Sequence, residues 1–241
     1  DCEVFSLSLP LPPLFEQEQI VEELERKLSR LEKMEGNFRT MAETAAQASR
    51  SVLTGTFCSL DAPIFKLSEL ENMGRIQLGR GRIISRRDLL EKPGNYPVYS
   101  SAATGDGLFG KYGEYMFDDT RITWSIDGGG RFFLRKGGER YSVTNVCGWI
   151  KVLDESMIVP DYLYHALYSR WLQKTFDYIH KAHPSVIRKE YEIPLPPLWD
   201  QKQIVEELEW KLLRLAKVEQ VAREAVAVCA QARRAVLAEA F

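Results

Sequence analysis

The chain carries the stretch Leu9-Pro-Leu-Pro-Pro-Leu-Phe-Glu-Gln-Glu-Gln-Ile-Val-Glu-Glu-Leu-Glu25 and, 184 positions later, the stretch Ile193-Pro-Leu-Pro-Pro-Leu-Trp-Asp-Gln-Lys-Gln-Ile-Val-Glu-Glu-Leu-Glu209. The match continues without gaps to Phe57 and Phe241, with 27 identities in 49 aligned positions. Such self-similarity indicates two copies of one structural unit. The 241 residues therefore divide into a first conserved region at 1–57, a unique segment at 58–192 and a second conserved region at 193–241.

Each copy predicts a long helix that begins after its proline cluster. Proline cannot continue a helix, and the acidic residues that follow suit a helix N-terminus. Apolar or small side chains then recur in steps of four and three, with one gap, which is the pattern of a coiled-coil seam. The expected seam comprises Ile20, Leu24, Leu31, Met34, Phe38, Met41, Ala45, Ala48 and Val52 in the first copy, and Ile204, Leu208, Leu215, Val218, Ala222, Ala225, Cys229, Ala232 and Val236 in the second.

The two long helices are expected to pair with each other in an antiparallel coiled coil. The ends of an inserted domain usually lie close together, so the middle segment would receive one helix and release the other at the same place. Each helix would be on the order of 55–60 Å long at 1.5 Å per residue. Two ordinary core helices are the alternative, but the matched lengths favour a structural spacer.

The middle segment predicts a mixed globule. Short β-like runs at Tyr96–Ser100, Arg121–Ile126 and Tyr141–Val146 are separated by turn residues. Helices are expected from about Arg86 to Lys92 and from Asp161 to about Tyr178. The predicted fold class is α+β, with a mixed α/β globule inserted between two long helices.

Composition and charge exclude several classes of protein. The chain is 45% hydrophobic and 27% charged, as in folded proteins rather than disordered ones. It lacks an uncharged apolar stretch of 18 residues and a basic leader, so we expect a cytoplasmic protein without membrane contact. The net charge is −2, with the middle segment at +2. Four scattered cysteines form no CxxC pair, which argues against a zinc site or a disulfide framework.

The sequence shows no catalytic constellation. Gly128-Gly129-Gly130 lacks the GK[ST] ending of a phosphate loop and suggests a turn with positive φ. His180 and His183 have no accompanying carboxylate or cysteine cluster, and Asp127 has no recognisable triad partner. We therefore predict no catalytic residue, no metal ligand and no cofactor in this chain.

What remains is a set of cations and polar loop residues. Arginines crowd the stretches 75–87 and 121–140, and arginine is suited to phosphates and to guanine edges. A solvated surface is the plainer interpretation of such runs. The doubled repeat raises the weight of DNA binding against that of a solvated surface.

The sequence resembles the specificity subunit of type I restriction-modification enzymes over nearly its whole length. The specific feature is Pro-Leu-Pro-Pro-Leu-x-x-Gln-x-Gln-Ile-Val before a long helix, at Pro10 to Val21 and again at Pro194 to Val205. A looser feature is the target-recognition pattern in the middle segment. It comprises Tyr96-Pro-Val-Tyr-Ser-Ser101, Ile122 to Gly130, Ser142-Val-Thr-Asn-Val146 and Pro160-Asp-Tyr-Leu-Tyr164.

The resemblance implies a non-catalytic targeting role on double-stranded DNA. In that family two recognition domains are held apart by two antiparallel helices, and each domain reads one half of an interrupted site. The helices also bind methyltransferase subunits, which use S-adenosylmethionine, while motor-nuclease subunits use ATP.

This sequence departs from the family in having one recognition domain between its repeats. Residues 1–8 resemble the last strand that precedes a proline-rich motif. A half-length subunit that pairs as a homodimer, or a fragment, would each account for the departure.

The expected DNA contacts are loop residues with donors, acceptors or a stacking face, together with cations for phosphates. For Trp124, core packing is an equally good interpretation. Expected base contacts are Ser100, Ser101, Thr104, Trp124, Asp127, Arg131, Asn145, His183, Ser185 and Arg188, and expected phosphate contacts are Arg80, Arg82, Arg86 and Arg87.

Two rival interpretations come from other classes. A nuclease or nucleotide-dependent enzyme would need clustered acidic residues or a complete phosphate loop, and the sequence has neither. A coiled-coil adaptor whose globule binds protein is compatible with the near-neutral middle segment. Sequence-selective, salt-sensitive DNA binding would separate it from a specificity subunit.

Overall fold

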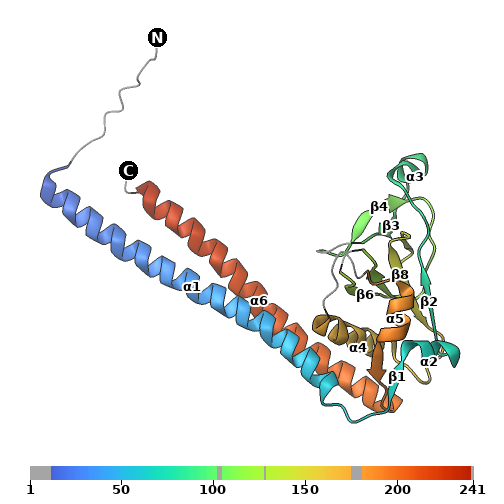
Figure 1. Ribbon diagram of the computed structural model, residues 1–241. Coiled ribbons are helices and arrows are strands. Elements are labelled where there is room, and N and C mark those ends of the chain that lie inside the picture. Colours follow the sequence, from blue (N-terminus) through green and yellow to red (C-terminus); the bar gives the residue numbers. More distant parts are fainter. Residues whose placement is uncertain (1–11, 102–104, 128, 175–180, 240–241) are drawn as a thin grey trace. The chain divides into compact units, whose positions relative to one another are not determined.

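The computed structural model describes residues 12–101, 105–127, 129–174 and 181–239. The chain forms two compact units, one made of residues 50–212 and the other of residues 1–49 with 213–241. The long helices α1 (Leu14–Cys58) and α6 (Leu198–Glu239) contribute to both units (Figure 1). This division differs from the sequence-based one, because the last turns of α1 and the first turns of α6 belong to the globular unit.

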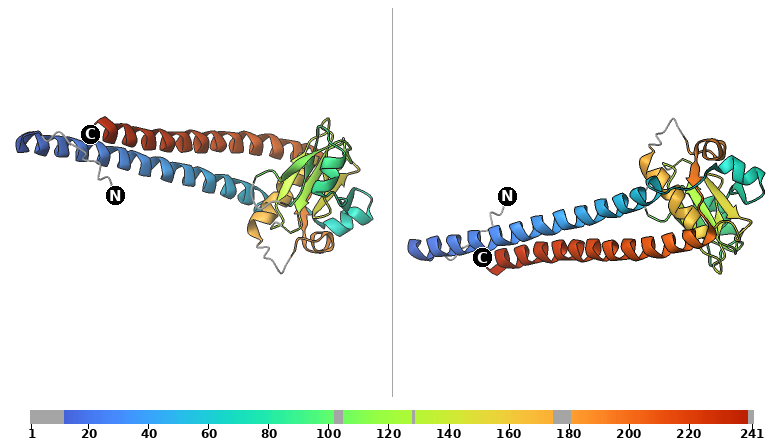
Figure 2. Two further views of the ribbon diagram at one scale, coloured as in Figure 1. Left: turned by 90° about the horizontal axis from the view of Figure 1, so that it is seen from above. Right: turned by 90° about the horizontal axis from the view of Figure 1, so that it is seen from below.

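The unit of residues 1–49 and 213–241 is a pair of helices. Its parts of α1 and α6 lie side by side, as the views of Figures 1 and 2 agree. The two helices run antiparallel (Figures 1 and 2), and Arg233 near the end of α6 lies 3.5 Å from Glu35 of α1. Ala45, Ala222 and Cys229 are buried along the pair, as expected for the alanine-rich half of the repeat. The predicted antiparallel pairing is confirmed.

The seam differs from the expected one at Ile20, Met34 and Met41 of α1 and at Val218 of α6, and Ile20 and Val218 are 41% and 42% exposed. Met34 and Met41 are 41% and 39% exposed, whereas their neighbours Glu35 and Ala42 are buried. After Leu31, the less exposed positions are therefore Glu35, Phe38, Ala42 and Ala45. The steps along the helix are four and then three residues, whereas the expected steps were three and then four. Glu35 tolerates this position because its carboxylate accepts a hydrogen bond from Arg39 at 2.5 Å, besides facing the Arg233 guanidinium.

The globular unit is built on three β-sheets (Figure 1). The largest is antiparallel throughout, in the order β2-β8-β5-β6. A three-stranded sheet has the order β4-β3-β7, and β1 pairs with β9. The strands are β1 (Ile64–Lys66), β2 (Ile76–Arg80), β3 (Tyr96–Tyr99), β4 (Leu108–Tyr112), β5 (Arg121–Ser125), β6 (Phe132–Arg135), β7 (Ser142–Val143), β8 (Cys147–Val152) and β9 (Glu192–Pro194).

Four shorter helices complete this unit, namely α2 (Leu67–Asn72), α3 (Arg86–Glu91), α4 (Pro160–Gln173) and α5 (Pro184–Glu190). The predicted helix near Arg86 is confirmed as α3, whose Ser85 accepts a capping hydrogen bond from the Asp88 N–H. The longer predicted helix is α4, which ends at Gln173, and the expected continuation over residues 175–178 lies outside the described residues. None of the described helices is long and apolar enough to cross a membrane.

The main core lies on one face of the four-stranded sheet. Ile122 and Trp124 of β5 and Phe132 of β6 pack there against buried side chains of α2, α4 and α5. Leu53 from the end of α1 and Leu208 from α6 join the same cluster. The sheet's other face carries Trp149, which packs in a second cluster with residues around the three-stranded sheet. The globule is therefore a layered α+β structure, as predicted.

Two glycine–tryptophan pairs fix the strand register of the large sheet. Gly79 of β2 stands opposite Trp149, and Gly148 of β8 stands opposite Trp124. A Cβ atom would lie 2.3 Å from the Trp149 ring at Gly79 and 2.0 Å from the Trp124 ring at Gly148. Only glycine leaves room for the neighbouring ring at these positions.

Candidate functional site

Polar loops gather at one end of the four-stranded sheet. Strand β2 ends at Arg80, β5 ends at Ser125, and β8 begins at Cys147. The pairs Arg80–Gly148 and Ser125–Cys147 place these three points at the same end. We call this end, with Ser100, Ser101, Asp127, Thr144, Asn145 and Lys181, the loop end.

Hydrogen bonds tie the loops of the loop end together. The hydroxyl oxygens of Ser100 and Thr144 lie 2.9 Å apart. The Ser101 hydroxyl donates to the Val146 carbonyl at 2.5 Å and accepts from the Asp127 N–H at 3.3 Å. The loops after β3, β5 and β7 therefore form one surface rather than three independent segments.

Two cations extend this surface. Arg80 donates through Nη2 and Nε to the Asn145 carbonyl, at 2.6 and 3.1 Å. Lys181 Nζ lies 3.0 Å from Asp127 Oδ1. Among the described residues, the Arg80 guanidinium bonds to this backbone carbonyl and forms no ion pair with a carboxylate.

An arginine and aromatic group lies next to the loop end. The Arg135 guanidinium carbon is 3.4 Å from the Tyr99 ring centre and 5.0 Å from that of Phe133, and its Nη2 donates to the Asp106 carbonyl at 2.5 Å. Burial lowers the pKa of Arg135 below its usual value, while nearby Tyr99 and Asp106 oppose that shift. Arg131 lies over Phe133 at 5.2 Å. These are cation–π contacts.

The structure brings five sequence-predicted residues together at the loop end. They are Ser100, Ser101, Asp127, Asn145 and Arg80. Arg131 immediately precedes β6, and its Nε is buried without a hydrogen-bond partner among the described residues. Thr104, residues 1–8 and His180 lie outside the described residues. The Gly129 and Gly130 turns do have positive φ, at 83° and 75°.

Trp124 is not available for base contact. Its side chain is 0% exposed, and its indole N–H donates to the Ala182 carbonyl at 2.7 Å. A stacking residue needs an accessible ring face, so this placement corrects the expected DNA contact. Trp124 is a core residue, as the alternative interpretation expected.

Three predicted residues around α5 have structural contacts. His183 caps α5, with Nδ1 2.9 Å from the Ser185 hydroxyl. Arg188 pairs with Glu71 at 2.6 Å and donates to the Leu78 carbonyl at 3.0 Å. Burial opposes ionisation of Glu71, but its bonds to Arg188 and to the Leu78 N–H outweigh this and lower its pKa. Arg188 thus holds α5 against α2 and β2.

The remaining predicted cations follow β2. Arg82 bridges to Thr144 through the backbone, lies 5.7 Å from the Tyr112 ring and is 3.4 Å from Glu114. Arg86 and Arg87 are exposed on α3, where Arg87 pairs with Glu91 at 2.6 Å. Arg82 therefore adjoins the loop end.

Sequence reasoning did not select Tyr99, Arg135, Thr144 or Lys181. Tyr99 and Thr144 lay within quoted motifs, and Arg135 lay in an arginine-rich stretch. The stacking of Arg135 on Tyr99 joins residues 36 positions apart, for which the sequence offers no signal.

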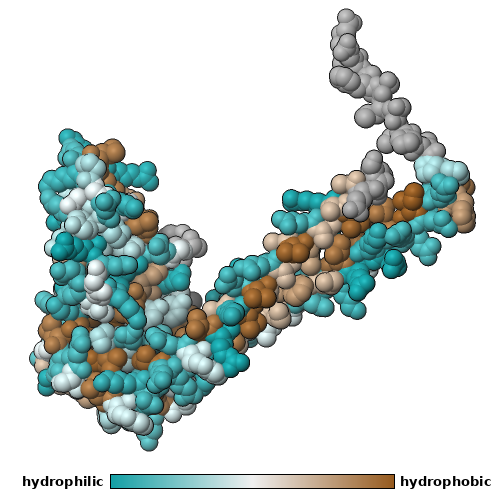
Figure 3. Space-filling view, turned by 180° about the vertical axis from the view of Figure 1, so that it is seen from behind, coloured by the Kyte–Doolittle hydropathy of each residue, from teal (hydrophilic) through white to brown (hydrophobic). Residues whose placement is uncertain are grey.

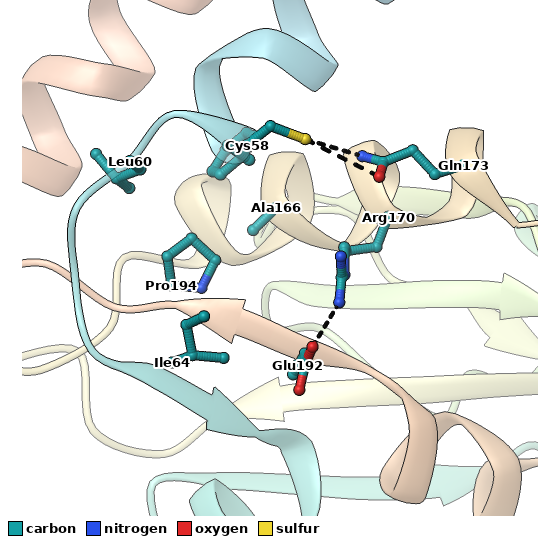
Figure 4. A pocket seen from close by; sticks show the side chains of 9 residues that line it. Cys58, Leu60, Ile64, Ala166, Arg170, Gln173, Glu192 and Pro194 are labelled. Atoms are coloured by element: carbon teal, nitrogen blue, oxygen red, sulfur yellow. Dashed lines mark hydrogen bonds and ion pairs between the residues drawn. The ribbon is translucent and has the colours of Figure 1, made fainter.

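A pocket of about 220 Å³ lies elsewhere in the globule. Cys58, Ile64, Arg170, Gln173 and Glu192 are among its lining residues (Figure 4). The Arg170 guanidinium donates to the Glu192 carboxylate at 2.8 Å across one wall. None of the sequence-predicted contacts lines this pocket. Among the described residues, no group of three or more His, Cys, Asp or Glu side chains could hold a metal ion.

Comparison with known proteins identifies the family. Residues 64–215 match the family described as "Type I restriction modification DNA specificity domain". The chain belongs to this family. The matched range holds the whole loop end, so the candidate surface belongs to the specificity domain.

Curated relatives are longer than the matched region. A putative type I specificity subunit from Mycoplasma pneumoniae is 35% identical over 135 residues, covering 54% of this chain and 43% of the relative. The type I restriction enzyme MpnII specificity subunit of the same organism is 31% identical over 134 residues, covering 54% of this chain and 39% of the relative. The matches thus span less than half the length of these two relatives.

Solved structures support the fold. The HsdS subunit from Thermoanaerobacter tengcongensis is similar over 97% of this chain and 60% of its own, with a TM-score of 0.61 and 18% identity. A chain from a study of assembly and conformational transition of the type I R-M system gives a TM-score of 0.76 with the same coverage and identity. The predicted architecture of two long helices and a mixed globule is therefore shared with specificity subunits.

Proposed function

We propose that this protein is the sequence-reading part of a type I restriction-modification complex. It binds double-stranded DNA through the loop end and directs methyltransferase and restriction subunits to an interrupted site. The observation that carries this proposal is the set of five predicted polar and cationic residues on one surface of a specificity domain. The chain itself chooses the site and performs no catalysis.

The chemistry of the loop end suits DNA. Asn145 and Asp127 offer side-chain groups to base edges, and Ser100 and Ser101 offer hydroxyls beside them. Arg80, Arg82, Arg86 and Arg87 supply cations for phosphates, which position a protein on the duplex without reading sequence. Arg131 serves as a further base contact, whereas the structural bonds of His183, Ser185 and Arg188 favour a supporting role.

The helix pair supplies the surface for methyltransferase subunits. Its outer face keeps exposed apolar side chains beside the buried seam (Figure 3). A folded protein rarely leaves such a stripe uncovered unless another protein binds it. The stripe comprises Met34 and Met41 of α1, and Val218, Val221 and Val228 of α6.

Cofactors then belong to the partner subunits. S-adenosylmethionine is used by the methyltransferase and ATP by the motor nuclease, and the complex works in the cytoplasm. A homodimer of this chain would present two loop ends and read a palindromic interrupted site. Sedimentation at micromolar concentration with DNA tests the dimer, and a monomer would contradict it.

The deciding experiment is co-expression with a type I methyltransferase subunit followed by mapping of methylated adenines in host DNA. A defined interrupted motif supports the proposal, and a palindromic motif supports the homodimer. Substituting Asn145 by Ala should change or abolish the motif, while Asn72→Ala on exposed α2 should not. Co-purification without sequence-selective DNA binding would instead support the adaptor alternative.

Docking on the helix pair is tested separately. Met34→Glu combined with Met41→Glu places two charges seven residues apart on one face of α1. We expect loss of methyltransferase co-purification with unchanged DNA binding. Thr40→Glu, at an exposed polar position of the same helix, is the control. Equal retention of the methyltransferase by both variants would contradict the proposed surface.

A further inference from the structure

Two apolar side chains project into solvent on the segment that follows β2. Leu90 of α3 is 82% exposed, and Ile83, shortly before α3, is 79% exposed. Among the described residues, these are the most exposed large apolar side chains. Figure 3 shows hydrophobic surface among hydrophilic surface at the end of the globular unit that carries α3. Single exposed apolar side chains are ordinary, but two on one short segment indicate a contact surface.

The packing of α3 does not account for either side chain. The helix is held by their sequence neighbours, because Ile84 and Leu89 pack against side chains of β3 and β4. A capping box between Ser85 and Asp88 fixes the first turn. The two exposed side chains are therefore not needed to hold α3 in place.

The segment before α3 is attached to the loop end. The Gly81 N–H donates to the Cys147 carbonyl at 3.0 Å, and the Arg82 N–H donates to the Val143 carbonyl at 3.2 Å. These bonds continue the pairing of the chain beyond the end of β2, which leads toward α3 (Figure 1). Ile83 thus follows directly on the loop end, and a ligand on that surface would lie beside it.

Cations flank both apolar side chains. Residues 80–92 hold five Lys or Arg against two Asp or Glu, a net charge of +3 in a chain whose net charge is −2. Arg82 precedes Ile83, and Arg86 lies one turn before Leu90 on the same face of α3. Arg86 is exposed and forms no ion pair among the described residues. This charge favours an anionic partner such as DNA over the apolar surface of a protein.

The neighbouring candidate base contacts favour one groove of that DNA. The Asn145 amide suits the edge of adenine in the major groove, where serine hydroxyls also find partners. The major-groove edges of the four base pairs present a single methyl group, which is at C5 of thymine. Aliphatic side chains beside such contacts therefore have one apolar partner in this groove.

We propose that Ile83 and Leu90 are specificity-determining residues that contact thymine methyl groups in the major groove. Arg86 binds a phosphate next to the thymine that Leu90 contacts. The inference rests on the proposed DNA binding and adds the kind of base that this segment reads. The expected effect is about fourfold in affinity for each methyl group that the contact buries.

The test uses the complex of this chain with its methyltransferase subunit and DNA duplexes that contain the mapped recognition motif. In a second set of duplexes deoxyuridine replaces thymine, which removes only the 5-methyl group. We expect the original chain to bind these duplexes about fourfold more weakly for each contacted thymine. Leu90→Ala and Ile83→Ala should each bind thymine duplexes more weakly and discriminate less between the two sets. Equal affinity of the original chain for both sets would overturn the proposal.

Leu153→Ala is the matched control. Leu153 is 51% exposed and follows β8 at the end of the four-stranded sheet opposite the loop end. This variant should keep the original ratio of affinities for thymine and deoxyuridine duplexes. The three side chains are exposed, so all three variants should keep the unfolding midpoint of the original chain. If Leu90→Ala and Ile83→Ala discriminate as well as Leu153→Ala does, the methyl contact is overturned.

Two other outcomes would assign the exposed pair to a different role and overturn the proposal. An equal loss of affinity for both sets of duplexes, with less bending of the DNA, would identify Ile83 and Leu90 as a wedge between base steps. Loss of methyltransferase co-purification at unchanged DNA affinity would identify a protein interface. Failure of the original chain to bind its motif selectively would contradict the proposed function as well, whereas selective binding without a deoxyuridine effect contradicts this inference alone.

Discussion

The two ends of the four-stranded sheet are built for different tasks. At the end opposite the loop end, Arg75 pairs with Asp154, and the Arg75 carbonyl accepts from the Leu153 N–H at 2.8 Å. Gln201 closes the nearby turn with hydrogen bonds to the Met157 carbonyl and the Val159 N–H. At the loop end, the exposed Arg80 guanidinium donates to a backbone carbonyl. The first end thus closes the fold with an ion pair and turn contacts, whereas the second presents loops that are bonded to one another beside an exposed arginine.

The largest expected effect comes from the core that both ends share. Trp124→Ala removes a fully buried side chain and the hydrogen bond to Ala182. We expect the free energy of unfolding to fall by about 3–5 kcal/mol, as for other buried aromatic truncations. Denaturant titration measures this. A loss of DNA preference at full stability would instead restore Trp124 as a base contact.

Asn145→Ala should act at the loop end alone. An asparagine amide pairs best with adenine, and losing such a contact costs about 1–3 kcal/mol of discrimination at one base pair. We expect binding to mutated sites to approach binding to the original site, with an unchanged unfolding midpoint. Asn72→Ala is the matched control. Competition binding across a set of single-base variants checks the result.

Arg80→Gln and Arg75→Gln compare the two ends on one strand. Arg80→Gln should weaken binding to all DNA sequences and reduce the slope of log affinity against log salt by about 1, as expected for one lost phosphate contact. Arg75→Gln should lower the unfolding midpoint and leave that slope unchanged. Binding titrations at several salt concentrations measure both slopes. Equal slopes for the two variants would contradict the proposed difference between the two ends of the sheet.

The smallest effect concerns pH. His165 is 7% exposed, and burial lowers its pKa below 6.5, with Lys136 assisting and Glu209 and Asp161 opposing. The Tyr164 ring lies 5.0 Å from the His165 ring and is tilted by 54° against it. The unfolded chain therefore binds the proton more readily, so this contribution to stability is full above about pH 6.5 and is lost as the pH falls. His165→Gln should flatten the fall of the unfolding midpoint between about pH 7 and 5. An equally steep fall in the variant would contradict the assignment.

Much of the architecture was predictable because the repeat identifies both long helices. The expected seam was wrong at Ile20, Met34, Met41 and Val218, which are exposed, because steps of three and four fit two neighbouring rows of helix positions equally well. Strands β2 and β8 were not among the runs that the sequence indicated most clearly, and Gly79 and Gly148 weaken their strand pattern. Those glycines are required by tryptophan rings of neighbouring strands, and the sequence does not show which strands are neighbours.

The site was predictable in part. Short polar segments between strands located Ser100, Ser101, Asp127 and Asn145. The sequence could not show that Arg188 has a structural role instead, because its partner Glu71 is 117 positions away. Accessibility, which separates a base contact from a core residue such as Trp124, depends on tertiary packing.

The glycine–tryptophan pairs have a consequence for how specificity changes over evolution. Gly79 with Trp149 and Gly148 with Trp124 hold the strands in one register through ring-to-backbone contact. Insertions, deletions and substitutions in the loops therefore cannot shift the strands without forcing a ring into a main chain. New target preferences can thus be acquired by exchanging loops on an unchanged sheet.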